Sequence, residues 1–217
     1  PCYDGENLCK RGDVVVVSVN HRLNVLGFLN LATDGGPAYA ASGNVGMLDL
    51  VAALEWVRDN IERFGGDPGN VTIFGQSGGG GKVNTLMAMP RAQGLFHKAI
   101  VQSGSMSMLR PRNDSARLGE EVVQVLGLAP GQLDKLQSLP YEELVEAART
   151  ANARLTKSPE GAPGGGGPFW APTADGTIVA GAPMIPNGPR LDTGIPLLVG
   201  CTLNEVSPSA YNEELEQ

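Results

Sequence analysis

The sequence predicts an α/β fold built on a parallel sheet, with a helical insertion. Between Val14 and Gln102, short apolar strands alternate with helical segments, and this alternation is typical of a parallel sheet covered by helices. One of the strands runs directly into a Gly-x-Ser-x-Gly turn centred on Ser77. From Asp114 to Ala153 the pattern is helical throughout, which indicates an insertion and not a continuation of the sheet.

The first half of the chain supplies most elements of the expected sheet. Val14–Val19 is a nearly continuous β-branched run, as expected of a strand buried on both faces of a parallel sheet. Asn44–Phe64 has apolar and charged residues at helical spacing and is followed by two glycines. The other expected elements are a strand over Val71–Phe74, a helix over Lys82–Met89 and a strand over Ala99–Gln102.

The composition of the chain divides it into four parts. Residues 1–110 are expected to form the core that carries the Ser77 turn, and residues 111–157 a helical cap or lid, although the same pattern fits ordinary surface helices. Residues 158–194 form a Gly/Pro-rich connection. Residues 195–217 return to the core with a strand over Ile195–Gly200 and a loop beyond it. The expected helices of the cap are Asp114–Leu126, Gln132–Ser138 and Tyr141–Ala153.

Charge and hydropathy exclude several classes of partner. The net charge of −7 argues against a nucleic-acid surface, because no basic cluster is present to neutralise phosphates. The longest apolar run is far short of the ~20 residues that a membrane span needs. No signal peptide is visible at the start of the sequence. These features leave localisation and oligomeric state open.

Three cysteines, Cys2, Cys9 and Cys201, match no zinc-binding spacing, so no metal site is expected. The odd count favours free thiols, with a Cys2–Cys9 disulfide as the alternative.

The Ser77 turn has the features of a nucleophile elbow. A strand and a helix flank Gly75-Gln76-Ser77-Gly78-Gly79, and the sharp turn holds the serine hydroxyl out above the edge of the sheet. Gly75 and Gly79 are expected because a Cβ at either position would clash. The backbone N–H of Gly78 is expected to point toward a developing oxyanion, at the positive end of the following helix.

A phosphate-binding P-loop is the competing interpretation of this glycine-rich turn. The sequence departs from that motif at two positions. Gln76 stands where the first glycine belongs, and Val83 follows Lys82 where a Ser or Thr would bind magnesium. These mismatches weaken a nucleotide-binding function.

Blocks on both sides of the turn carry a resemblance to a known family. They are Val15–Leu23, Leu26–Phe28, Gly43–Asp49, Ala53–Val57, Phe64–Pro68, Phe74–Gly79 and Gln102–Ser105, with a weaker match over Pro196–Glu205. In this order they resemble the type-B carboxylesterases, a family that includes cholinesterases and para-nitrobenzyl esterases. The resemblance implies the α/β-hydrolase fold. So many ordered blocks are more specific than the Ser77 turn alone.

The resemblance implies a role for each matched residue. Ser77 matches the nucleophile, and Gly78 matches an oxyanion-hole donor, although the family usually has Ala there. Glu205 falls at the triad acid, just past a core strand, in the α/β-hydrolase order of Ser, acid and His. From spacing alone, Glu205 also fits a solvated loop carboxylate, and Asp175 is the second candidate acid, although Asp175-Gly176 is typical of a turn. Ser103 matches a serine that hydrogen-bonds near the acid.

Other positions depart from the family pattern. Gln76, next to the nucleophile, replaces a glutamate common in animal members, which weakens the case for a cationic choline substrate. His21 stands where the family has Tyr, and His97 is not at the position of the catalytic histidine either. That histidine lies well downstream of the acid, beyond Gln217, and the family's oxyanion glycines lie upstream of Pro1. We therefore expect a central fragment truncated at both ends, inactive and marginally stable by itself.

Together these features predict a serine carboxylic-ester hydrolase. Ser77 would attack an ester carbonyl and form an acyl-enzyme, with a downstream His as base oriented by Glu205. The expected substrate is a small-molecule ester, and no cofactor is expected. The alternative is a catalytically inactive binding or adhesion module, as occurs in this fold family. Such relatives often lack the serine, whereas Ser77 is intact here.

Overall fold

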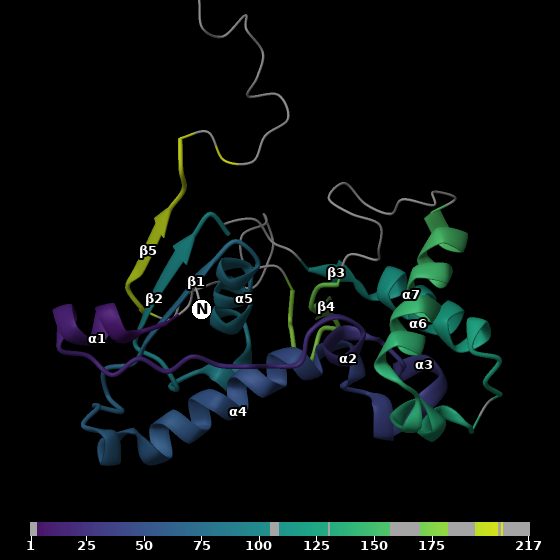
Figure 1. Cartoon of the computed structure of the whole chain (residues 1–217), viewed down its shortest axis with the longest axis horizontal. Coiled ribbons are helices and arrows are strands. Elements are labelled where there is room, and N and C mark those ends of the chain that lie inside the picture. Colours follow the sequence, from purple (N-terminus) through teal and green to yellow (C-terminus); the bar gives the residue numbers. More distant parts are fainter. Residues whose placement is uncertain are drawn as a thin grey trace, which may run out of the picture.

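A three-stranded parallel sheet forms one side of the molecule, on the left in Figure 1. The computed structural model describes residues 4–104, 109–129, 131–156, 170–181, 194–203 and 205. The strands are β1 (Thr72–Gln76), β2 (Lys98–Gln102) and β5 (Leu197–Gly200), in the spatial order β1-β2-β5. The three strands predicted at these places are confirmed. Because all three are parallel, their carboxyl ends lie at the same edge of the sheet.

Two helices bury one face of this sheet. Helix α5 (Gly78–Met87) follows β1 and packs on β1 and β2, and helix α4 (Val45–Asn60) contacts α5. Helix α4 continues as the 3₁₀ helix η3 (Ile61–Phe64), so the helix predicted from Asn44 to Phe64 is confirmed in extent. The hydrophobic core contains Met47 and Val51 of α4 and Val101 of β2, all fully buried.

The strand predicted over Val14–Val19 is wrong. The segment belongs to neither sheet and runs irregularly from α1 (Glu6–Gly12) to α2 (Asn24–Phe28) (Figure 1). Val14 is 52% exposed, not buried on both faces. β-Branched residues fit a pleated surface, but a strand forms only where a neighbouring backbone supplies hydrogen bonds. The β-branched pattern of Val14–Val19 shows the side-chain preference, but it does not show whether a neighbouring strand is present.

The connection between α2 and α4 contains short helices that the sequence did not reveal. They are α3 (Ala32–Gly35), η1 (Gly36–Tyr39) and η2 (Ser42–Asn44), and a further 3₁₀ turn, η4 (Pro90–Ala92), follows α5. Each spans only three or four residues. Elements this short carry too little periodicity to be recognised from sequence.

The three helices predicted after the core are confirmed. They are α6 (Arg112–Val125), η5 (Leu133–Ser138), which is a 3₁₀ helix, and α7 (Tyr141–Thr156). They share a second hydrophobic cluster with Val25 and Leu29 from the α2 region, and lie beside the core (Figure 1). Arg154 of α7 pairs with Glu121 of α6 at 2.9 Å. The role of residues 111–157 as a cap stays a prediction.

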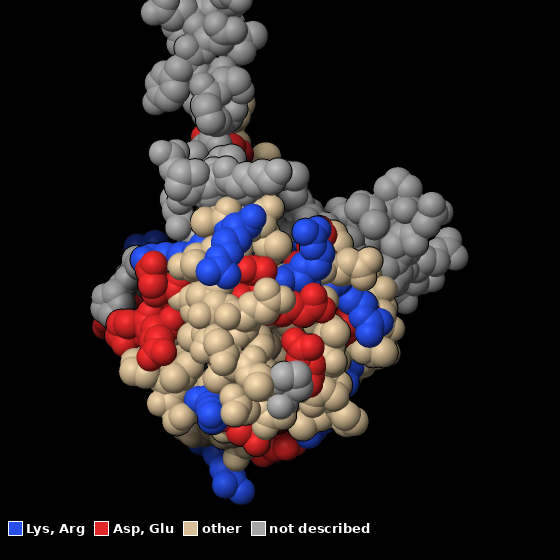
Figure 2. Space-filling model, turned by 90° about the vertical axis from the view of Figure 1, so that its right-hand side faces the viewer, with Lys and Arg blue, Asp and Glu red and all other residues tan. Residues whose placement is uncertain are grey.

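Acidic and basic side chains are interspersed on the face of the molecule shown in Figure 2. Neither sign forms a continuous patch on that face. Within the described ranges, no helix is both long and apolar enough to cross a bilayer.

A buried polar contact joins the two halves of the chain. Strands β3 (Arg110–Pro111) and β4 (Thr173–Ala174) form a short parallel pair next to α6. Asn44, only 1% exposed, donates from Nδ2 to the Thr173 carbonyl and to Asp175 Oδ2, both at 2.9 Å. Its Oδ1 accepts the Thr173 N–H at 2.8 Å. One side chain therefore fastens the start of α4 to a segment 129 residues further along.

Several predictions lie wholly or mostly outside the described residues. They concern Cys2, and with it the Cys2–Cys9 disulfide, and most of the Gly/Pro-rich connection over 158–194. Cys9 and Cys201 form no disulfide with each other or with any other described residue.

Replacing Asn44 is expected to destabilise the fold more than replacing an asparagine with a local role. Asn44→Ala leaves the buried Thr173 N–H without its acceptor, so the free energy of unfolding should fall by about 2–4 kcal/mol. Asn60→Ala is the control, because Asn60 bonds only to the Trp56 carbonyl within its own helix, and should cost about 0.5 kcal/mol or less. Urea unfolding of the full-length protein measures both. Equal losses in the free energy of unfolding would show that the contact between Asn44 and Thr173 does not stabilise the fold.

Candidate active site

Three chain segments leave the carboxyl edge of the sheet side by side. Ser77 follows β1, Ser103 follows β2 and Cys201 follows β5. The Ser77 N–H donates to the Gln102 carbonyl and the Ser103 N–H to the Gly200 carbonyl, both at 2.8 Å. Hydrogen bonding between the strands therefore continues one residue past β1 and one residue past β2. In parallel α/β sheets this edge is where ligands bind.

Ser77 has a backbone conformation that side-chain-bearing residues rarely adopt. Its φ is 53° and its ψ is −120°, and it occupies the N-cap position of α5. Such strain costs about 1–3 kcal/mol and persists only where the surrounding structure enforces it. The residue is exposed, and its hydroxyl forms no hydrogen bond to a described residue. The turn thus presents Ser77 as the sequence predicts.

The close approach of α5 to the sheet depends on three glycines. A Cβ on Gly75 would lie 2.4 Å from the Gly79 carbonyl carbon, and a Cβ on Gly80 would lie 3.0 Å from Gly104 Cα. A Cβ on Gly104 would lie 2.5 Å from the Ser77 carbonyl oxygen. All these neighbours are backbone atoms, which cannot move aside. The turn therefore requires glycine at these positions for space.

The predicted clash at Gly79 is wrong. A Cβ there meets no atom within 4 Å among the described residues, and its φ is not left-handed. In a helix, Cβ atoms point outward and backward, and the space where a Cβ of Gly79 would lie is open although the Gly79 backbone lies close to Gly75. Gly80 and Gly104 are the close-contact positions instead. The sequence signal that could have indicated a close contact at Gly104 is a glycine two residues after the end of β2.

Gly78 is the first residue of α5. Its N–H therefore has no partner within the helix, and it lies at the positive end of the helix dipole. A helix start next to the serine is a suitable place for a group that binds a developing oxyanion.

Glu205 lies at the same edge, held by three hydrogen bonds. Its Oε1 accepts the Ser103 hydroxyl at 2.7 Å and the Thr202 N–H at 2.8 Å. Its own N–H donates to Thr202 Oγ1 at 3.2 Å. The Ser103 hydrogen bond, followed by those from Thr202, lowers the pKa of Glu205. The structure thus brings together Ser103 and Glu205, which are 102 positions apart in the sequence.

Asp175 is engaged elsewhere. Its Oδ1 accepts three backbone N–H groups, those of Thr177, Ile178 and Val179, while Oδ2 accepts from Asn44. This is the turn that Asp175-Gly176 predicts, and Gly176 has a φ of 79°. The carboxylate borders a cavity of about 310 Å³ lined by residues of the η1 region, β4 and Arg112. Both oxygens of Asp175 are therefore used in structural hydrogen bonds, one within its own turn and the other to Asn44.

Neither histidine is bonded to Ser77. The His97 ring accepts the Val71 N–H on Nδ1 at 3.2 Å. The backbone N–H of His97 donates to the Val71 carbonyl, at the amino end of β1. His21 Nδ1 donates to the Arg22 carbonyl at 2.8 Å. Sequence reasoning missed that His97 extends the β1–β2 pairing with its ring.

Gln76 and Lys82 complete the residues singled out by sequence. Gln76 is the exposed last residue of β1, opposite Gln102 in the sheet register. Lys82 Nζ reaches back to the Gly78 carbonyl at 3.4 Å, and Val83 is buried in the core. Among the described residues no group of three or more His, Cys, Asp or Glu side chains is arranged to hold a metal ion.

The family model described as the carboxylesterase family matches residues 1–217. The chain belongs to the carboxylesterase family. It is 41% identical over 205 residues to the para-nitrobenzyl esterase of Bacillus subtilis (strain 168), covering 94% of this chain and 40% of that relative. It is 35% identical over 210 residues to human carboxylesterase 3, covering 94% of this chain and 33% of the relative. The chain thus spans about 40% or less of the length of these relatives.

Solved structures agree on the fold. The carboxylesterase EST55 of Geobacillus stearothermophilus, solved at pH 6.8, matches with a TM-score of 0.78 at 43% identity, over 93% of this chain and 41% of that one. A structure described as a thermophilic PNB esterase matches with a TM-score of 0.79 at 37% identity, over 99% of this chain and 44% of its own. The predicted α/β-hydrolase fold is confirmed for this carboxylesterase chain.

Two neighbouring glycines of the elbow are expected to respond oppositely to the same change. Gly79→Ala adds a methyl group in open space and removes backbone freedom from the unfolded chain, so stability should rise by about 0.4–1 kcal/mol. Gly80→Ala places its methyl group against Gly104 and should cost about 1–3 kcal/mol. Urea unfolding of the two variants compares them directly. A loss at Gly79 as large as that at Gly80 would contradict the geometry.

The Ser103 hydroxyl is expected to set how far into acid Glu205 stays ionised. Ser103→Ala removes the largest cause of the lowered pKa, so the pKa of Glu205 should rise toward its ordinary value. Because the folded-state pKa is lowered, the stabilising effect of the carboxylate is present above the ordinary Glu pKa. It is lost as pH falls through the lowered value.

In Ser103→Ala the total loss should be smaller and complete at a higher pH, because the folded-state pKa lies closer to the ordinary value. Carboxyl-carbon NMR titration of Glu205 measures the shift. Ser138→Ala, which removes a hydroxyl on η5, is the matched control and should leave the titration unchanged. An unchanged titration in Ser103→Ala would contradict the assigned cause.

Proposed function

We propose that this protein is a serine hydrolase of carboxylic esters, with Ser77 as the nucleophile. The observation that supports this most is the exposed, strained serine between β1 and α5. Few uses other than nucleophilic attack justify holding a serine at a φ of 53° with its side chain exposed. Membership of the carboxylesterase family supports the same reaction.

The reaction would proceed through an acyl-enzyme. Ser77 Oγ attacks the ester carbonyl carbon, and the carbonyl oxygen becomes an oxyanion that accepts the Gly78 N–H. The base that took the Ser77 proton gives it to the leaving oxygen as the C–O bond to the alcohol breaks, and the acyl group stays on Ser77. Water then attacks this acyl-enzyme and releases the acid. No metal or organic cofactor takes part in these steps.

Glu205 is proposed as the acid that orients a histidine base. A glutamate is ionised near neutral pH, the Ser103 and Thr202 hydrogen bonds lower the pKa of Glu205 further, and its negative charge would stabilise an imidazolium ion. Ser103 and Thr202 would fix its position. The base itself would be a histidine other than His21 and His97, because neither ring is hydrogen-bonded to Ser77 and neither is at the position of the family's catalytic histidine.

The proposed substrates are small-molecule esters. One structural neighbour is described as a PNB esterase, and another, from Clostridium hathewayi, as an esterase that hydrolyses aliphatic aromatic polyesters. The neutral Gln76 beside the nucleophile supplies no negative charge to attract a cationic alcohol group. Uncharged alcohol groups are therefore favoured.

Ser77→Ala is expected to abolish both covalent labelling and turnover. A fluorophosphonate probe should label the full-length protein at Ser77, because the probe reacts only with an activated serine. Labelling should vanish in Ser77→Ala, and hydrolysis of a chromogenic ester should fall at least about a thousandfold. Ser138→Ala is the control and should be labelled like the wild type. A folded wild-type protein that takes no label would overturn the proposed function.

A further inference from the structure

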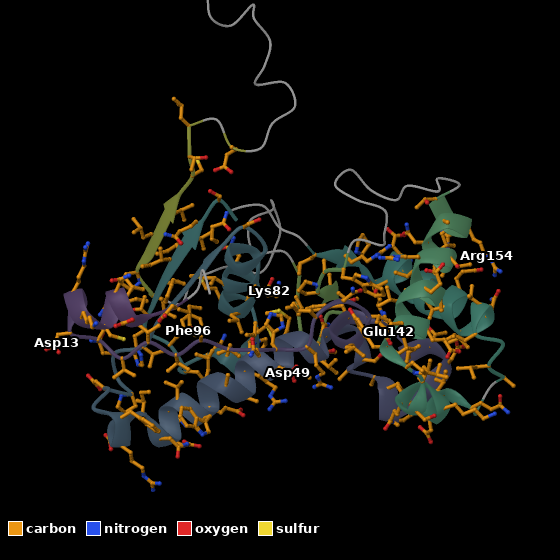
Figure 3. The ribbon with its side chains drawn as sticks, in the orientation of Figure 1. Asp13, Asp49, Lys82, Phe96, Glu142 and Arg154 are labelled. Atoms are coloured by element: carbon orange, nitrogen blue, oxygen red, sulfur yellow. The ribbon has the colours of Figure 1, made fainter. Side chains whose placement is uncertain are left out.

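Lys82 lies close to the proposed oxyanion hole. It is on the second turn of α5, and helical side chains point back toward the amino end of their helix. Its Nζ accordingly donates to the Gly78 carbonyl at 3.4 Å. Figure 3 shows Lys82 beside α5, above Asp49 of α4. The ammonium group is therefore next to the residue whose N–H would bind the oxyanion.

The positive charge of Lys82 has no acidic partner in the part of the chain that the structure describes. The ion pairs found there do not include Lys82. Asp49 is occupied by Arg22, which reaches its two oxygens at 2.6 and 2.9 Å. Burial lowers the pKa of Lys82. A partly buried cation without a counter-ion is costly, unless a negative charge comes close to it at some stage of function.

Lys82 also lies beside the open face of Gly78. The space where a Cβ of Gly78 would lie is 3.8 Å from Lys82 Nζ, and among the described atoms outside Ser77, Gly79 and the backbone of α5 no other is within 4 Å. Four consecutive glycines begin α5, and glycine has the greatest backbone freedom of any residue. The hydrogen bond from Lys82 restrains the first residue of this run. Without it, the Gly78 N–H would be less firmly oriented.

We propose that Lys82 is a positioning residue of the oxyanion hole, which holds the Gly78 backbone and places a positive charge beside it. The inference rests on the proposed ester hydrolysis at Ser77. The substrate carbonyl is neutral and becomes an oxyanion only during reaction, so a nearby cation stabilises the transition state more than the bound ester. Lys82 should therefore act on kcat and leave KM nearly unchanged.

The charge of Lys82 also predicts a dependence on pH. The groups that face it are His21, from the segment before α2, and the Arg22–Asp49 pair that fixes this segment on α4. Burial lowers the pKa of His21, and Lys82 lowers it further. Since the pKa of Lys82 is itself lowered, Lys82 loses its charge on raising the pH earlier than an exposed lysine does. A decline of kcat at alkaline pH should follow that loss.

The test compares Lys82→Met with two matched variants in the full-length protein. Lys82→Met keeps the length of the side chain and removes the charge and the donor. It should lower kcat for a chromogenic ester about tenfold, with KM within about twofold, and the alkaline decline should disappear. Lys82→Arg keeps both properties and should remain within about threefold of the wild type. Lys98→Met removes a lysine of β2 that contacts Asn70, and should change neither value.

Each outcome decides the proposal. A Lys82→Met variant with the kcat and alkaline decline of the wild type would overturn it, as would a change confined to KM. Should Lys82→Met fail to fold by thermal denaturation, Lys82→Gln, which keeps a donor without the charge, gives the same decision. Fluorophosphonate labelling distinguishes a failure of the proposed ester hydrolysis from a failure of the role proposed for Lys82. A wild type that takes no label refutes ester hydrolysis itself, whereas equal labelling rates for wild type and Lys82→Met refute only the role of Lys82.

Discussion

The close contact between α5 and the carboxyl end of the sheet is the constraint on which the rest of the site depends. At Gly75, Gly80 and Gly104, backbone atoms occupy the space that a side chain would need. Only this packing lets the chain reverse from β1 into α5 within a single residue. That residue is Ser77, and the sharp turn forces its backbone into a strained conformation with a positive φ. The same contact directs the amino end of α5 toward the edge where β2 and β5 end.

The charges at this edge are arranged around the serine in a consistent way. Glu205 is held as a carboxylate by Ser103 and Thr202, on the side of β2 and β5. Lys82 contributes a positive charge next to Gly78, on the side of α5. Gln76, the last residue of β1 and the neighbour of Ser77, is neutral. In the mechanism that we propose, the negative charge of Glu205 would stabilise an imidazolium and the positive charge of Lys82 an oxyanion, as an acyl-transfer reaction requires.

Comparison of the expected and observed elements shows which predictions sequence supports. The strands on either side of α5, the long helix α4 and the helices α6 and α7 were all predicted, because each has a clear pattern in its own residues. The pattern of Val14–Val19 was equally clear, yet the segment is not a strand. Its residues satisfy the local preference, and hydrogen bonding to a neighbouring strand is not a local property. The spatial need for glycine was likewise assigned to Gly79 and belongs to Gly80 and Gly104.

The sequence by itself determined the parallel core, the position of the Ser77 turn and the family, because these rest on periodicity and on motifs of consecutive residues. The tertiary structure decided which glycines are in close contact, that Ser103 bonds to Glu205, that Asn44 fastens α4 to Thr173, and that Lys82 reaches Gly78. Apart from the Gly75–Gly79 contact and the Lys82–Gly78 contact, these join residues more than twenty positions apart, and one sequence carries no direct record of such distances. Lys82 and Gly78 are on adjacent turns of one helix, but the burial that gives their contact its importance comes from packing.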